Sequence, residues 1–280
     1  MTNRQVAQRV QGVGTQDGAG VSLTRIIGQP LLRHLDPFLM LDFFGSDQPN
    51  EYLAGFPAHP HRGFQTVTYM LKGKMRHKDS VGNEGVIETG GIQWMNAGRG
   101  IIHEEMPEQT DGLLKGFQLW VNLPAKDKMS APGYQDIPAE QVPSVALNPH
   151  ASAKVLAGEL MNVNGPVKTA KVSPMFIDVH WQSCTTVDIP IQQGHNAFIY
   201  CYEGRVDVDG TNINAGTLAV LSDGNQVTLD CGNDTSVAGK AIVVAARPIG
   251  EPIVQYGPFV MNSESEIQQA LFDYQRGTLA

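Results

Sequence analysis

Two short segments in the first half of the chain carry side chains that could bind a metal. The first contains His59 and His61, and the second contains His103 and Glu105. The members of each pair are two residues apart, and side chains with that spacing face the same side of a β-strand. If the two strands lie close together in one barrel, three imidazoles and one carboxylate converge. That donor set suits a divalent first-row metal such as iron, manganese, nickel or copper, and zinc fits it less well.

Strand-forming sequence surrounds both pairs. β-Branched and aromatic residues are mixed over residues 64–71 and again over 116–123, and the glycine at position 73 fits a turn between strands. The same signals return in the second half, over residues 187–191, 197–202, 205–209, 217–221 and 241–246. The thirty glycines and seventeen prolines fit the many turns of an all-β protein.

One helix is predicted at the end of the chain. Ser263 and Glu266 have the spacing of a capping box, and Gly277 fits a C-terminal cap. Between them the apolar residues repeat at helical spacing, at Ile267, Ala270, Leu271 and Tyr274.

The second half of the chain weakly repeats the first. Residues 69–73 align with 200–204, and residues 91–95 align with 216–220. Under this alignment the metal-binding candidates fall opposite residues that are poor metal ligands as a set, namely Pro190, Gln192, Thr228 and Asp230. Prolines are frequent between residues 126 and 149. We therefore predict a metal-binding barrel over residues 1–125, a linker over 126–149, and a second barrel with the closing helix over 150–280.

Composition excludes several classes of function. The net charge is −8 and no basic block is present, so direct binding to nucleic acid is not expected. No apolar run approaches the roughly 20 residues that span a bilayer, and the N-terminus lacks the apolar core of a signal peptide. The three cysteines, Cys184, Cys201 and Cys231, form no CxxC pair and are interpreted as reduced thiols. The expected location is therefore the cytoplasm.

Several longer motifs give the chain a family resemblance. It resembles the pirins, two-barrel members of the cupin superfamily, along almost its whole length. The matching stretches are residues 35–42, 59–69, 93–103, 116–123 and 250–261. The resemblance implies two facing cupin-type β-barrels with metal only in the first. It also implies one metal per chain, usually iron, held by His59, His61, His103 and Glu105.

The resemblance implies two alternative functions. The first is a metal-dependent dioxygenase that cleaves a flavonol such as quercetin with molecular oxygen. In that reaction Glu105 would take the substrate's hydroxyl proton as a general base. The second is a non-catalytic, metal-dependent regulator that binds a protein partner, such as a metabolic enzyme or a transcription factor. Both functions need the same four ligands, so the sequence does not separate them.

Other side chains near the motifs could serve a substrate. Arg62 and Arg99 could steer an anion at the mouth of a pocket, or they could pair with surface carboxylates. Four further side chains could line an aromatic pocket or belong to the core: Trp94, Met95, Phe117 and Trp120. The five remaining histidines have no partner at matching spacing and are interpreted as surface or packing residues: His34, His77, His150, His180 and His195.

Overall fold

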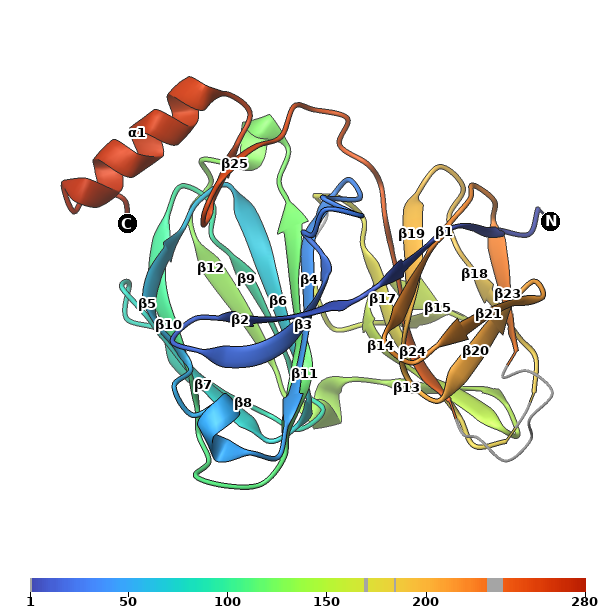
Figure 1. Ribbon diagram of the computed structural model, residues 1–280. Helices are drawn as coiled ribbons and strands as arrows, with labels where there is room; N and C mark the ends of the chain where they lie inside the picture. Colours follow the sequence, from blue (N-terminus) through green and yellow to red (C-terminus); the bar gives the residue numbers. More distant parts are fainter. Residues whose placement is uncertain (1, 169–170, 184, 231–238) are drawn as a thin grey trace. The chain divides into compact units, whose positions relative to one another are not determined.

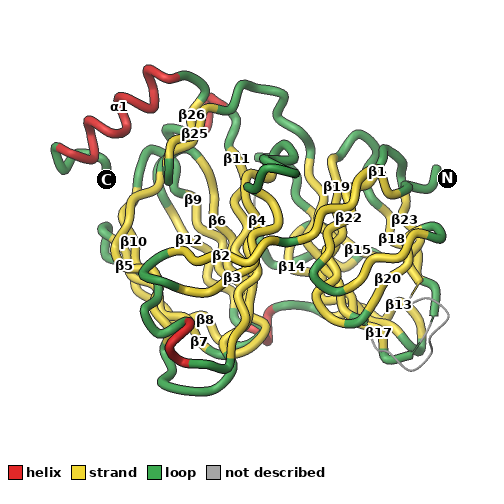
Figure 2. The backbone as a smooth tube through the Cα atoms, in the orientation of Figure 1, coloured by secondary structure: helices red, strands yellow, loops and turns green. Residues whose placement is uncertain are grey.

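The computed structural model describes residues 2–168, 171–183, 185–230 and 239–280, so Cys184 and Cys231 lie outside the described residues. Within these ranges the chain forms β-strands, three short 3₁₀ helices and one α-helix, and it divides into two compact units (Figure 1, Figure 2). We call the unit of residues 13–140 and 249–280 barrel 1, and the unit of residues 1–12 and 141–248 barrel 2.

Barrel 1 contains two antiparallel sheets whose side chains share a core. The described residues of its larger sheet form seven strands in the order β12 (Gly133–Ile137), β9 (Ile92–Asn96), β6 (Phe64–Lys72), β11 (Leu114–Asn122), β4 (Phe38–Ser46), β3 (Val21–Ile27) and β2 (Val13–Asp17). Its smaller sheet has the order β5 (Phe56–His61), β10 (Ile101–Pro107), β7 (Lys74–Asp79) and β8 (Glu84–Glu88). The 3₁₀ helices are η1 (Pro49–Glu51), η2 (Ala125–Asp127) and η3 (Ala139–Gln141).

Barrel 2 has the same arrangement of strands. In its described part the larger sheet runs β1 (Val6–Gln11), β22 (Thr217–Leu221), β19 (Asn196–Glu203), β24 (Lys240–Ala246), β17 (Met175–Trp181), β14 (Ala151–Ala157) and β13 (Ser144–Asn148). The smaller sheet runs β18 (Val187–Pro190), β23 (Gln226–Asp230), β20 (Arg205–Val208) and β21 (Thr211–Asn214). A two-stranded ribbon of β15 (Glu159–Leu160) and β16 (Val163–Asn164) completes the unit.

The two strand orders correspond position by position. The sequence repeat predicted that residues 69–73 match 200–204 and that 91–95 match 216–220. The structure confirms that these segments lie in equivalent strands, because β6 and β19 occupy the same place in their sheets, as do β9 and β22. The ladders shift the second match by one residue, because Tyr69 pairs with Ile92 whereas Tyr200 pairs with Leu218. The predicted all-β architecture of two tandem barrels is therefore confirmed.

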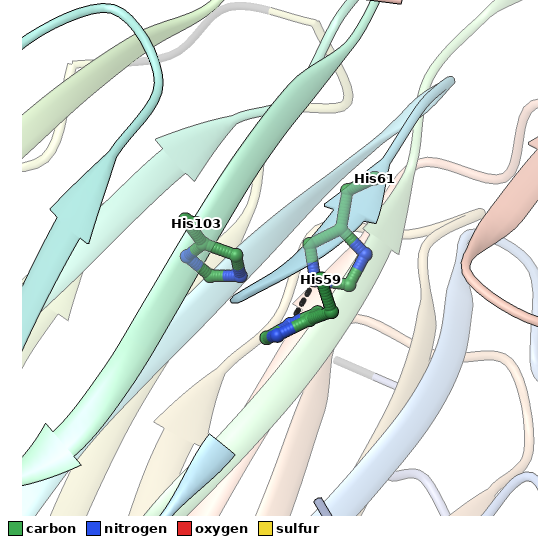
Figure 3. A group of neighbouring side chains, drawn as sticks. All are labelled: His59, His61 and His103. Atoms are coloured by element: carbon green, nitrogen blue, oxygen red, sulfur yellow. Dashed lines mark hydrogen bonds between the residues drawn. The ribbon is translucent and has the colours of Figure 1, made fainter. Parts of the chain in front are cut away.

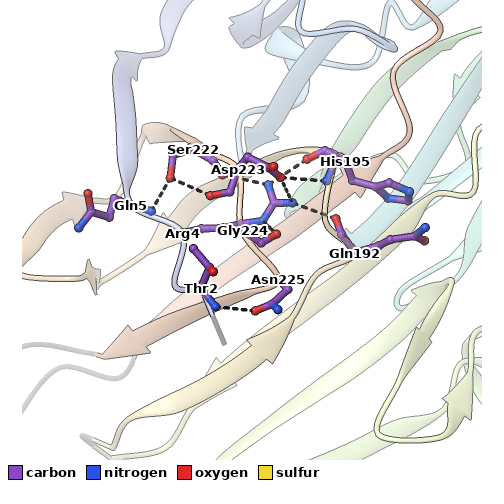
Figure 4. Close-up of polar contacts among 10 residues, drawn as sticks. Thr2, Arg4, Gln5, Gln192, His195, Ser222, Asp223, Gly224 and Asn225 are labelled. Carbon is purple, nitrogen blue, oxygen red and sulfur yellow. Dashed lines mark hydrogen bonds and ion pairs between the residues drawn. The ribbon is translucent and has the colours of Figure 1, made fainter.

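The ends of the chain do not follow the predicted domain ranges. The first strand, β1, pairs with β22 and so belongs to barrel 2, where β12 takes the equivalent edge of barrel 1. The side chain of Arg4 fixes this placement. It is fully buried, and its guanidinium donates hydrogen bonds to the backbone carbonyls of residues 192, 195, 222 and 224 (Figure 4). A fully buried guanidinium needs such acceptors, so this segment is held firmly on barrel 2.

The C-terminal segment belongs to barrel 1, although it follows barrel 2 in the sequence. The chain leaves barrel 2 at residue 248, forms β25 (Val254–Tyr256) and β26 (Phe259–Met261), and ends in α1 (Glu264–Gln275), all within barrel 1. The predicted helix is confirmed: Ser263 is the N-cap and accepts a hydrogen bond from the backbone of Glu266, and Gly277 has a φ of 70° beyond the last turn. It does not close the second barrel, however. Its buried residues, Ile267 and Ala270, pack in one cluster with Phe259 and Met261.

The predicted linker also differs from the structure. Residues 126–149 contain β12, which pairs with β9 in barrel 1, and β13, which pairs with β14 in barrel 2. The prolines of this segment lie at the strand ends or between the strands, where they break no ladder. In the part of the chain that the structure describes, no helix combines the length and apolarity of a membrane span.

Candidate metal centre

Two paired strands of barrel 1 bring the predicted histidines together. β5 and β10 are antiparallel, with His103 opposite His59 and Ile101 opposite His61. The register shifts between His103 and Glu105, because β5 holds one extra residue there. On its other side β10 pairs with β7 without a shift. The alternation of side chains along β10 is therefore preserved, and His103 and Glu105 are both buried.

The three imidazoles converge on one point. One ring nitrogen from each of His59, His61 and His103 lies within 4.8 Å of the others, and among the described residues no other group of three such donors is found (Figure 3). The nitrogens His59 Nε2 and His61 Nε2 are 3.0 Å apart. Neither ring nitrogen of His103 has a hydrogen-bond partner, although this side chain is 1% exposed. Unpaired buried donors are costly, and a metal ion would satisfy them.

The electrostatics favour neutral rings at this site. Burial lowers the pKa of His61 and of His103 well below the ordinary value, and neighbouring histidines lower both further. A neutral imidazole keeps a lone pair for a metal, whereas a protonated ring does not. The donor chemistry and the orphaned nitrogens therefore fit a single transition metal.

Glu105 lies near this group without being part of it. Its two carboxylate oxygens accept hydrogen bonds from Thr68 Oγ1 at 3.0 Å and from Gln118 Nε2 at 2.9 Å. The neighbouring Glu104 points outward, with a side chain that is 31% exposed and 3.3 Å from a guanidinium nitrogen of Arg76. Strand alternation predicted this difference between the two glutamates, and the structure confirms it.

The ladder registers explain how Glu105 is held. Residues in register across six strands of the larger sheet form a continuous polar row, in the order Arg25, Asp42, Gln118, Thr68, Gln93 and Asp136. Arg25 forms two hydrogen bonds with Asp42, at 2.9 and 2.7 Å. The smaller sheet places Glu105 against the middle of this row. A buried carboxylate needs such fixed donors, because burial removes its water.

His77 is a buried neighbour that sequence reasoning missed. It is opposite Glu105 in the β7–β10 ladder, is fully buried, and stacks on Tyr134 with ring centroids 4.9 Å apart. Gln93 hydrogen-bonds to its ring and also donates to Asp136 at 2.7 Å. The one available signal was the spacing along β7. Met75, His77 and Asp79 are two residues apart, so they share one face of the strand, and all three are buried.

A large cavity of about 1040 Å³ opens beside the histidines. Its lining includes His59, His61 and Glu105, together with the aromatic side chain of Trp120, whose ring centroid lies 5.2 Å from that of His61. Of the four candidates for the pocket wall, Trp120 therefore lines the cavity, whereas Trp94, Met95 and Phe117 are buried and do not. The rest of the wall is largely apolar and includes Leu39, Met40, Phe44, Phe56, Met75 and Ile253.

Arg62 does not lie at the mouth of the cavity, which was one of the two positions considered for it above. Its side chain is 3% exposed, and its guanidinium contacts Asp273 of α1 at 2.7 Å and the backbone carbonyl of Arg99. It does not line the cavity, and neither does the exposed Arg99. Arg62 therefore ties the C-terminal helix to the strand that carries the histidines.

Barrel 2 has no comparable group of metal donors among its described residues. Apolar side chains from both sheets fill its interior, including Ile177, Ile189, Val206 and Val227. The inward positions of β18, the residue after it and β23 are taken by Ile189, Ile191, Val227 and Leu229, which are all buried in the core. The sequence alignment had pointed to Pro190, Gln192, Thr228 and Asp230, each one position away. This corrects the alignment by one residue on each strand, and it leaves the inward positions without metal ligands.

The fold and the site define a class: a protein of two tandem cupin-type barrels, one with a histidine centre and one filled with apolar side chains. Comparison with known proteins gives the family. The sequence matches the pirin family over residues 20–121 and the pirin C-terminal cupin domain over residues 176–280. The chain belongs to the pirin family, as its motifs indicated.

Individual relatives cover the whole chain. A pirin-like protein of Caulobacter vibrioides is 48% identical over 278 residues, which are 99% of each chain. A protein of Pseudomonas aeruginosa with the provisional name quercetin 2,3-dioxygenase is 46% identical over 284 residues, covering 99% of this chain and 98% of its own. A crystal structure of quercetin 2,3-dioxygenase from Acinetobacter baumannii superposes with a TM-score of 0.91 at 34% identity, covering 99% of both chains.

Proposed function

We propose that the protein is a metal-dependent dioxygenase acting on a flavonol such as quercetin. The observation that carries the proposal is the convergence of three imidazoles, two of them buried, beside a large, mostly apolar cavity. The similarity to a quercetin 2,3-dioxygenase structure over the full chain supports the same activity. One divalent transition metal per chain is expected, with iron first, and with manganese, nickel and copper as alternatives.

His59, His61 and His103 would hold the metal, with Glu105 as the fourth ligand. When bound, the metal would act as a Lewis acid that polarises the substrate's oxygen donors and templates its encounter with oxygen. The polar row beneath Glu105 keeps this carboxylate in place through Thr68 and Gln118. The proposed ligand set is thus braced before a metal or a substrate arrives.

The hydrogen bonds around Glu105 also suit a general base. The Thr68 hydroxyl has one proton but two acceptors in reach, Glu105 Oε1 at 3.0 Å and Gln118 Oε1 at 2.5 Å. If Glu105 takes a proton from the substrate's hydroxyl, the protonated carboxyl group can donate a hydrogen bond to Thr68 Oγ1, and the Thr68 hydroxyl can then donate its own hydrogen bond to Gln118 Oε1. The protonated carboxyl group is then fully hydrogen-bonded. Both protonation states are accommodated without rearranging the row.

The cavity supplies the remaining requirements. Trp120 offers an aromatic face next to His61, against which a flavonol ring can pack. The apolar wall replaces water around the ring system and strengthens electrostatic interactions at the site.

Oxygen consumption tests the proposal. The protein is loaded separately with iron, manganese, nickel and copper, and oxygen uptake is recorded after quercetin is added. Uptake that requires both metal and quercetin, with loss of the flavonol absorbance, is expected for at least one metal. Uptake no faster than in the metal-free control for all four metals would contradict the proposal and would favour a regulator that binds a protein partner.

A further inference from the structure

The rim of the cavity carries a cation that nothing in the described chain neutralises. Arg33 and His34 line the cavity and are exposed. Neither side chain has a hydrogen bond or an ion pair with any other described residue. By contrast, Arg25, the other cavity arginine, bonds to Asp42 and Asp17, in each case at a shortest distance of 2.7 Å.

The loop that carries Arg33 is well braced. On one side of Arg33, the backbone N–H of Gly28 donates to the Leu32 carbonyl at 2.9 Å. On the other side, the N–H of Leu35 donates to the Phe38 carbonyl at 2.8 Å. The Asp36 carboxylate then accepts hydrogen bonds from the N–H groups of residues 249 and 250, where the C-terminal segment begins. Arg33 is thus presented at the rim by a fixed backbone.

The positive and negative charges that line the cavity would offset each other, except at Arg33, once a divalent metal is bound. The negative groups of its lining are Asp17, Asp42 and Glu105. Arg25 and a divalent metal at the histidines would together offset these three charges. Arg33 would then be the unbalanced charge of the loaded site. A guanidinium is a planar donor fork that matches the oxygens of a carboxylate or a sulfate.

We propose that the cavity accepts an aromatic substrate with an anionic oxygen group at the end remote from the metal, and that Arg33 recognises this group. The inference rests on the proposed function, because it places the reacting end of the substrate at the histidines. Arg33, His59 and His61 line the same cavity, whose volume of about 1040 Å³ accommodates an extended ligand. The apolar wall, which includes Leu39, Met40 and Ile253, lies along the same cavity.

Binding measurements with matched ligands test this inference. The metal-loaded protein is titrated without oxygen with quercetin and with its monosulfates on ring A and on ring B. In the wild type, at least one sulfate should bind about fivefold tighter than quercetin, which corresponds to about 1 kcal/mol for an ion pair partly open to water. This preference should weaken as salt is added.

Two variants separate recognition from general charge. In Arg33→Gln the ratio of the Kd for quercetin to the Kd for the preferred sulfate should fall from about five to about one. Lys72→Gln is the matched control, because Lys72 is an exposed cation of barrel 1 that does not line the cavity, and it should keep the wild-type ratio.

Each outcome decides the inference. A preference for sulfate that disappears only in Arg33→Gln supports it, even if no oxygen is consumed and the proposed activity fails. Oxygen uptake with quercetin but no preference for either sulfate overturns the inference and leaves the proposed activity standing. Equal loss of preference in both variants overturns it in favour of a diffuse effect of charge. Failure of all three flavonols to bind overturns both proposals.

Discussion

Replacing Glu105 by glutamine should separate the metal site from the fold. Glutamine keeps the shape of the side chain, and the surrounding hydrogen bonds can be retained. Its carbonyl can accept from Gln118 Nε2, its amide can donate to Thr68 Oγ1, and the Thr68 hydroxyl can then donate to Gln118 Oε1. Stability of the metal-free protein should therefore change by less than about 1 kcal/mol.

The metal should respond much more strongly than the fold. The substitution removes the negative charge and the basicity of the proposed fourth ligand. Losing a group behind a metal ligand typically lowers metal affinity by about 10–100-fold, and a direct ligand should matter at least as much. Any turnover should fall further, because the proposed base is lost as well. Competition with a coloured chelator gives the metal Kd, and thermal unfolding of the metal-free protein gives the stability.

Glu104→Gln is the matched control for this substitution. Glu104 is the neighbouring glutamate, but its side chain is partly exposed and pairs with Arg76, which also contacts Glu84 and Glu108. Exposed pairs of this kind contribute about 0–1 kcal/mol to stability, so the fold should tolerate the change. Because the Glu104 side chain points away from the histidines, the metal affinity should stay near that of the wild type. If Glu104→Gln released the metal while Glu105→Gln retained it, the assignment of the inward glutamate would be wrong.

Two further predictions concern the contact between the C-terminal segment and the histidine strand. Lys128 is 1% exposed and donates to the carbonyls of Gly63 and Val260 and to Asn122, and burial lowers its pKa to about 8. Between pH 8 and pH 10.5 the unfolded chain, whose Lys128 has a pKa near the ordinary 10.5, holds more protons than the folded chain. This group should therefore raise the stability by about 2 kcal/mol between pH 8 and pH 10. Chemical denaturation at pH 8 and pH 10 measures this, and an equal slope in Lys128→Met would argue against it. Gly63→Ala should destabilise by roughly 3 kcal/mol or more, because its φ is 90° and a Cβ there would meet the Val260 carbonyl oxygen at 2.0 Å. Gly82→Ala, at a similar φ with nothing within 4 Å, should cost only about 1 kcal/mol, and equal losses for both would refute the steric argument.

The sequence predicted those parts of the site that depend on local alternation. His59 and His61 lie on one strand and His103 and Glu105 on another, so parity alone put each pair on one face. The inward position of Glu105 followed in the same way. The row behind Glu105 was not predictable, because it depends on the register between six strands. Register is a property of strand pairs, and no single strand encodes it.

The domain ranges were wrong for a similar reason. Residues 6–11 carry only two strongly apolar side chains, Val6 and Val10, and this short pattern does not say which barrel they face. The choice is made by Arg4, whose acceptors lie about 190 to 220 positions further along the chain. Contacts of that separation leave no local pattern. Pairing with a carboxylate was one of the two alternatives for Arg62 and is confirmed, but its partner, Asp273, could not be named on the same grounds.

Metal analysis of the wild type and of one double variant decides whether barrel 1 binds a single metal at its histidines. We expect close to one transition metal per chain in the purified wild type, because the three histidines converge in barrel 1 and apolar side chains fill barrel 2. His59→Ala combined with His61→Ala should remove that metal while the circular dichroism spectrum stays that of a folded β protein. Two metals per chain, or one metal retained in the double variant, would contradict the assignment of the site.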